Sequence, residues 1–155
     1  MMKTVVTAES VYVDPSALLK LYLKEPESRV LAIWRTRIGD PLLLTHHGRV
    51  ELINGIGLAA YRGIVTDDTR KAALAALDDD LAQGRYKQAD LLWRATLKKA
   101  GDLSREHTHS LGCRSLDVLH VASAIELQLK HFVTFDGRQQ QLARAAGLKL
   151  VTPTV

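Results

Sequence analysis

The hydrophobic positions of the chain alternate between short strand-like runs and helix-like spacing. A β-branched run at residues 5–13 ends at Asp14-Pro15, where an aspartate suits a helix N-cap and a proline suits the first helical turn. Gly39 and Gly147 each follow a helical pattern, as terminators commonly do. Strands are predicted at 5–13, 41–45, 131–135 and 148–151, and helices from 15 to the Glu25-Pro26 break, at 28–38, around 50–60, at 67–81, 87–97, near 107, at 115–129 and at 137–146.

The order of these elements indicates an α/β fold. Strands separated by helices favour a mainly parallel sheet that is covered on both faces, with its functional crevice at the carboxyl ends of the strands. We find no internal repeat, no low-complexity segment and no linker, so residues 1–155 are expected to form one domain.

Composition and charge narrow the class of protein. Hydrophobic residues make up 46% of the 155 positions, which is enough for one sizeable core. The net charge of +4, from 21 basic and 17 acidic residues, permits an anionic partner such as nucleic acid without requiring one. The lone Cys113 excludes an internal disulfide. Without a long apolar run or a signal-peptide pattern, we expect a soluble cytoplasmic protein with no membrane segment.

Four acidic residues lie at helix starts or strand ends in apolar surroundings: Asp14, Glu51, Asp117 and Asp136. Asp14 and Asp136 directly follow predicted strands, so both should face the crevice. Carboxylates gathered in one crevice repel and raise one another's pKa unless a cation neutralises them. Hard oxygen ligands of this kind predict Mg²⁺ or Mn²⁺, which could activate water for phosphodiester cleavage.

Three neighbouring polar residues are candidates to support the acids. Ser16 and Thr134 each lie two residues from an aspartate and could hydrogen-bond a carboxylate or a bound water. Arg114 could offset the negative charge or hold a phosphate, or it could be a surface cation. His120 could hold a carboxylate, although we favour a packing role for a histidine in so apolar a helix. The simpler interpretation of the acids also stays open, with Asp14 and Asp136 as helix caps and Glu51 as a solvated helical residue.

Several segments together resemble a known family, and they occur in the same order over nearly the whole chain. They are VDPSA at 13–17, VE at 50–51, RSLDVLHVA at 114–122, FVTFD at 132–136, GRQ at 137–139 and AGL at 146–148. These segments resemble the PIN domains of VapC-type toxins. The regions around Asp117 and Asp136 are the most specific parts of the match.

The resemblance implies a fold, an activity and partners. It implies a three-layer α/β/α sandwich and a Mg²⁺- or Mn²⁺-dependent endoribonuclease, with Asp14, Glu51, Asp117 and Asp136 as the metal-binding catalytic acids and Ser16 and Thr134 as polar helpers. It also implies a homodimer, a cognate VapB-type antitoxin that blocks the crevice, and operator DNA bound only through the antitoxin complex.

Two other functions remain open from the sequence. One is a PIN-like module that binds RNA with little or no catalysis. The other is an aspartate-based phosphoryl-transfer enzyme, which would also place an aspartate such as Asp14 after its first strand. Against the latter, Asp14-Pro15-Ser16 lacks the paired Asp-x-Asp arrangement.

Overall fold

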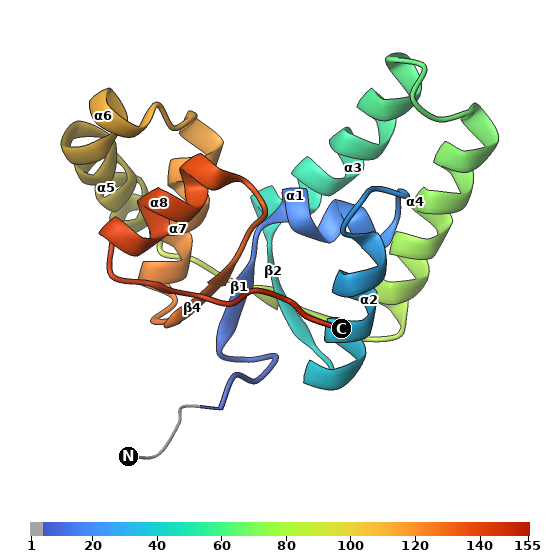
Figure 1. Cartoon of the computed structure of the whole chain (residues 1–155), viewed down its shortest axis with the longest axis horizontal. Helices are drawn as coiled ribbons and strands as arrows, with labels where there is room; N and C mark the ends of the chain where they lie inside the picture. Colours follow the sequence, from blue (N-terminus) through green and yellow to red (C-terminus); the bar gives the residue numbers. More distant parts are fainter. Residues whose placement is uncertain (1–4) are drawn as a thin grey trace.

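The computed structural model describes residues 5–155 (Figure 1). Five short strands alternate with helices along this part of the chain. The strands are β1 (Val11–Val13), β2 (Leu42–Thr45), β3 (Tyr86–Ala89), β4 (His131–Val133) and β5 (Lys149–Leu150). The helices are α1 (Pro15–Leu18), a 3₁₀ turn (Leu19–Leu21), α2 (Ser28–Ile38), α3 (His46–Tyr61), α4 (Asp67–Ala82), α5 (Trp93–Leu103), a π-helical segment (Ser104–Thr108), α6 (His109–Leu111), α7 (Ser115–Glu126) and α8 (Gly137–Ala145).

All the paired strands are parallel. β4 lies between β1 and β5, with Tyr12 opposite Phe132, and β2 pairs with β3. β1 and β2 lie side by side where the two ladders meet, so the strands follow the spatial order β3-β2-β1-β4-β5 (Figure 1). Parallel strands place all their carboxyl ends at one edge, as the pattern of alternating elements predicts.

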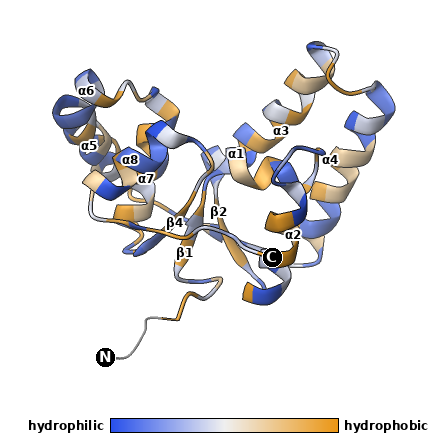
Figure 2. Ribbon diagram, viewed as in Figure 1, coloured by the Kyte–Doolittle hydropathy of each residue, from blue (hydrophilic) through white to orange (hydrophobic). Residues whose placement is uncertain are grey.

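Helices cover both faces of this sheet, which confirms the predicted α/β/α sandwich. Val11 and Val13 point into one apolar cluster with α1 to α4, whereas Tyr12, between them, points into a second cluster with α5, α7 and α8. This alternation is what the two-residue period of a strand produces when both faces are buried. Figure 2 shows apolar residues on the strands and on the helix surfaces turned toward them.

One predicted helix, at residues 87–97, was wrong. The structure has the strand β3 at Tyr86–Ala89 and starts α5 only at Trp93. Only the two end residues of β3 are buried, and its interior Lys87 and Gln88 are helix-favouring and exposed. Pairing with β2 overrides that local preference, because backbone hydrogen bonding to a neighbouring strand is a tertiary effect.

Some predicted elements are present with shorter bounds, whereas the helix predicted around 50–60 is longer and covers His46–Tyr61. The first strand covers only Val11–Val13 of the predicted 5–13, because residues 8–10 form a turn. The first helix becomes 3₁₀ after Leu18, and β4 ends at Val133 rather than at 135. Among residues 5–155 no helix is both long and apolar enough to cross a membrane.

Candidate active site

Asp14 is a buried carboxylate that follows β1 and caps α1. Its side chain is only 1% exposed. One oxygen, Oδ2, accepts hydrogen bonds from the backbone N–H of Ser16 at 3.0 Å and from the Ser16 hydroxyl. The other, Oδ1, accepts from the Gln139 side-chain amide at 2.8 Å. The capping interpretation of Asp14 therefore holds, yet the carboxylate is also bound by a residue 125 positions away.

Asp136 has the same relation to β4 and α8 that Asp14 has to β1 and α1. Its Oδ1 accepts from the backbone N–H groups of Arg138 at 2.9 Å and Gln139 at 3.0 Å, which caps α8. The Thr134 hydroxyl accepts from the backbone N–H of Asp136 at 3.1 Å. Thr134 thus fixes the turn that carries Asp136, while Ser16 bonds the Asp14 carboxylate directly.

Asp117 lies in the first turn of α7, with its side chain 16% exposed. Burial raises the pKa of this carboxyl above its usual value, and the negative charges of Asp14 and Asp136 raise it further. Arg114 acts in the opposite direction, since its Nε lies 3.5 Å from Asp117 Oδ2. The three aspartates, far apart in sequence, therefore lie close enough to repel one another.

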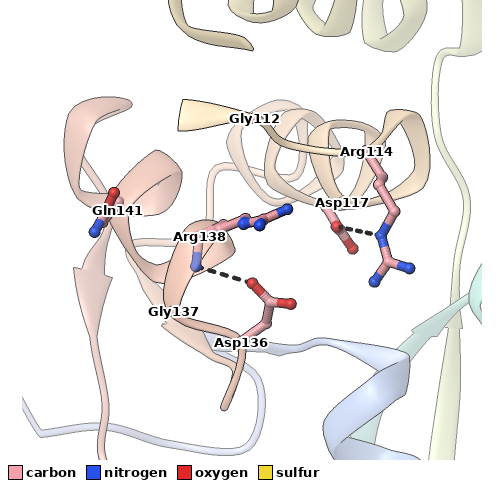
Figure 3. A pocket seen from close by; sticks show the side chains of 7 residues that line it. All are labelled: Gly112, Arg114, Asp117, Asp136, Gly137, Arg138 and Gln141. Atoms are coloured by element: carbon pink, nitrogen blue, oxygen red, sulfur yellow. Dashed lines mark hydrogen bonds and ion pairs between the residues drawn. The ribbon is translucent and has the colours of Figure 1, made fainter. Parts of the chain in front are cut away.

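A cavity of about 500 Å³ opens between α7 and α8. Asp117 and Asp136 face the same space in it, with the side chains of Arg114 and Arg138 beside them (Figure 3). Gly112, Gly137 and Gln141 complete its lining. Two acids and two cations around one opening can hold both a cation and an anionic substrate.

Gln139 is a site residue that the sequence analysis missed. It is fully buried, and its amide nitrogen donates to Asp14 Oδ1 and, at 3.3 Å, to the backbone carbonyl of Asp117. It lies three residues after the cap Asp136, the spacing of a capping box, in which such a glutamine would bond back to its own cap. That spacing marks a helix start but gives no indication that the amide crosses to Asp14.

Glu51, on α3, lines a neighbouring depression together with one of the three aspartates, Asp117. This second hollow, of about 330 Å³, is lined by Glu51 and Asp117 together with Arg114, Ser115 and Leu116. The Glu51 Oε2 is 2.5 Å from Nε2 of His120, which is fully buried. His120 is therefore packed in the core, as the sequence favours, and it also holds the carboxylate of Glu51.

The chemistry of these donors fits a hard divalent cation. Carboxylate oxygens are the preferred protein ligands of Mg²⁺ and Mn²⁺, and such an ion would relieve the repulsion that raises the pKa of Asp117. Within residues 5–155, however, no three His, Cys, Asp or Glu side chains are already gathered closely enough to hold an ion. An ion at this site would need side chains to close on it or water to complete its coordination, as Mg²⁺ commonly does.

Comparison with known proteins shows the family to which the chain belongs. Residues 11–145 match the PIN domain family, so the chain belongs to that family. Among individual proteins, it is 30% identical to ribonuclease VapC47 of Mycobacterium tuberculosis (strain CDC 1551 / Oshkosh), over 92% of this chain and 96% of the relative. It is 29% identical to ribonuclease VapC46 of Mycobacterium tuberculosis (strain ATCC 25618 / H37Rv), over 94% of this chain and 98% of the relative. The resemblance to VapC-type PIN domains is thereby confirmed.

Proposed function

We propose that this protein is a metal-dependent endoribonuclease that acts as the toxin of a toxin–antitoxin pair. The observation that carries the proposal is the convergence of Asp14, Asp117 and Asp136 at the carboxyl edge of the sheet, with the pKa of Asp117 raised by burial and by its two neighbours. Relatives of nearly the same length carry the name ribonuclease VapC.

Each acid has a distinct part in the proposed site. Asp117 and Asp136, which line the open cavity, are the direct ligands most accessible to an ion, and Glu51 approaches Asp117 from the adjoining hollow. Asp14 lies deeper, where hydrogen bonds from Ser16 and Gln139 hold it in place. It contributes a negative charge at a fixed position in the site. A Mg²⁺ or Mn²⁺ ion held by these carboxylates would supply Lewis-acid chemistry for phosphodiester hydrolysis.

Arg114 and Arg138 are the proposed phosphate contacts. Both line the cavity that contains Asp117 and Asp136 (Figure 3). A guanidinium can donate two parallel hydrogen bonds to a phosphate, which makes arginine well suited to an RNA backbone. The ion pair between Arg114 and Asp117 would be exchanged for such a contact once a cation takes its place on the carboxylate.

The burial of Asp14 disfavours the phosphoryl-transfer alternative. A nucleophilic aspartate must present an oxygen to the attacked phosphorus atom, whereas both oxygens of Asp14 accept hydrogen bonds and the residue is 1% exposed. The non-catalytic RNA-binding module differs from the nuclease only in turnover, so a cleavage assay separates these two functions.

The test is RNA cleavage by purified protein with Mg²⁺ or Mn²⁺. We expect cleavage that a chelator stops and that Asp14→Asn and Asp117→Asn each reduce at least about 100-fold, since each removes a charge from the site. Asp78→Asn, in an exposed acid of α4, is the matched control and should retain full activity. Binding of RNA without metal-dependent cleavage would instead identify a binding module, and full activity in both site variants would reject the assignment.

A homodimer and a VapB-type antitoxin are the proposed protein partners. Apolar side chains remain exposed on two helices, Val50 and Ile53 on α3 and Trp93 and Leu97 on α5. Contact between the rings of His47 and Trp93, with centroids 5.0 Å apart, holds the starts of these helices together. Exposed apolar side chains of this kind are suited to covering by another chain. Light scattering of the wild type and of Ile53→Glu tests self-association, and co-purification with the product of an adjacent small gene tests the antitoxin.

A further inference from the structure

A buried chain of hydrogen bonds lies behind Glu51. Tyr12 Oη is 2.6 Å from Nδ1 of His120, and Nε2 of the same ring is 2.5 Å from Glu51 Oε2. Tyr12 is 4% exposed and His120 is fully buried. The three residues come from β1, α7 and α3, so the chain joins the helical layer that contains α3 to the layer that contains α7.

With Glu51 ionised and His120 neutral, the chemistry of the three groups sets the direction of the hydrogen bonds. An ionised carboxylate can only accept hydrogen bonds, so the N–H at Nε2 of His120 donates a hydrogen bond to Glu51. In a neutral ring Nδ1 is then the acceptor, and the Tyr12 hydroxyl is its donor. Burial raises the pKa of Tyr12 above its ordinary value, which keeps that hydroxyl protonated.

Aromatic packing holds both rings of the chain in place. The Tyr12 ring is stacked on Phe132 with centroids 5.4 Å apart and an angle of 1° between the planes. The His120 ring is stacked on His47 at 4.8 Å and 20°. His120 can therefore not turn to follow Glu51, and Glu51 must adopt the rotamer that meets Nε2.

Glu51 is consequently held from behind while it lines the hollow that it shares with Asp117. Its hydrogen bond to His120 uses Oε2, and Oε1 has no hydrogen-bond partner among residues 5–155. A glutamate on a helix surface has several rotatable bonds, and fixing them costs conformational entropy. In this protein folding already orders the Glu51 side chain, so that binding a cation would not have to.

We propose that His120 and Tyr12 are positioning residues for Glu51, which they hold with one carboxylate oxygen available on the side of Asp117. The inference rests on the proposed metal-dependent function and deepens it, because it explains how an acid on a separate helix joins the site. Partners that orient a metal-binding side chain in this way typically change metal affinity 10- to 100-fold when they are removed.

Two substitutions of His120 separate positioning from packing. His120→Gln can place its amide nitrogen where Nε2 lies and still donate to Glu51, whereas the shorter His120→Asn reaches only the region of Nδ1. Both leave an amide in the same buried place. We expect Mn²⁺ affinity, measured by calorimetry, to fall at least 10-fold in His120→Asn and to stay within about 3-fold of wild type in His120→Gln. Equal affinities in the two variants would overturn the proposal.

Tyr12→Phe provides a second variant that keeps the stacked ring and removes only the hydroxyl. Nitrogen NMR of the metal-free protein should find His120 protonated at Nε2 in the wild type, and the Nδ1 signal should shift in Tyr12→Phe. A wild-type ring protonated at Nδ1 alone would overturn the proposed direction of the chain, whether or not the protein is a nuclease.

Thr96→Val is the matched control. Thr96 is a fully buried polar residue of α5 whose hydroxyl donates to the Leu92 carbonyl at 3.0 Å, and among residues 5–155 it has no hydrogen bond to Tyr12, His47, His120 or Glu51. Its Mn²⁺ affinity should equal that of the wild type, and a loss equal to that of His120→Asn would assign the effect to packing. If the wild type itself neither bound Mn²⁺ nor cleaved RNA, the proposed function would fail, whereas normal Mn²⁺ binding in His120→Asn would reject the positioning role alone.

Discussion

Asparagine substitutions at Asp14 and Asp117 should change the stability of the metal-free protein in opposite directions. Both replacements remove one negative charge and keep the side-chain shape. The two carboxylates nevertheless have opposite environments. Asp14 accepts three hydrogen bonds in a site that is 1% exposed, whereas Asp117 has a raised pKa caused by burial and by repulsion from Asp14 and Asp136.

The magnitudes follow from these environments. In Asp14→Asn an NH₂ group replaces one of the two carboxylate oxygens. This donor would face the donor groups of either Ser16 or Gln139. Hydrogen bonds to a charged group contribute about 1.5–3 kcal/mol, so we expect a loss of about 2 kcal/mol. At Asp117 the change removes like-charge repulsion, which is worth roughly 1 kcal/mol for unit charges a few ångströms apart in water. The ion pair that is lost with exposed Arg114 offsets part of this gain, and the relief of burying a charged carboxylate adds to it.

Thermal unfolding followed by circular dichroism, in chelator at neutral pH, measures both effects. For a chain of this length 1 kcal/mol corresponds to about 2–4 °C, so Asp14→Asn should lower Tm by about 4–8 °C and Asp117→Asn should raise it by about 2–4 °C. Added Mn²⁺ should stabilise the wild type more than Asp117→Asn. Equal decreases of Tm in both variants would refute the claim that Asp117 is electrostatically strained.

Three further predictions follow from single contacts. Replacing Arg114 and Arg138 together by alanine should weaken RNA binding in chelator and reduce the salt-dependence slope by roughly 1.4, the value for two phosphate contacts on a single strand. Burial and a neighbouring histidine lower the pKa of His47 to about 4, so the unfolded chain takes up a proton first as pH falls from about 6.5 to 4. Stability should drop by about 2 kcal/mol across that window, and His47→Gln should flatten the drop, as urea titrations can measure. Gly48→Ala should cost about 1–3 kcal/mol, because a Cβ there would lie 2.8 Å from the hydroxyl that caps α3. Gly57→Ala, on the same helix with open space around it, should gain about 0.5–1 kcal/mol.

Each of these predictions has a result that would contradict it. An unchanged salt slope in the double arginine variant would place the RNA elsewhere on the protein. A pH dependence of stability that is the same in the wild type and in His47→Gln would mean that folding does not lower the pKa of His47. Equal stabilities of the two alanine variants would show that the close approach at Gly48 carries no cost.

Local sequence determined much of the fold and part of the site. Helix-terminating glycines, the Asp-Pro helix start and strand-like runs predict most elements, because caps and side-chain periodicity depend on neighbours in the chain. Asp14 and Asp136 could be predicted to approach each other, since each follows a parallel strand whose carboxyl end faces the same edge. Asp117 could be singled out by its place at the start of an apolar helix, but its match to a metal-binding acid came from the family resemblance.

Only the tertiary structure decided which side chains act on one another. β3 is a strand because β2 pairs with it, although its own residues favour a helix. Gln139 bonds Asp14 across 125 positions of the chain, and His120 bonds Glu51 across 69. No local sequence pattern predicts a contact between residues so far apart. The shift in the pKa of Asp117 has the same origin, because burial and repulsion between charges depend on where folding places them and not on their order in the chain.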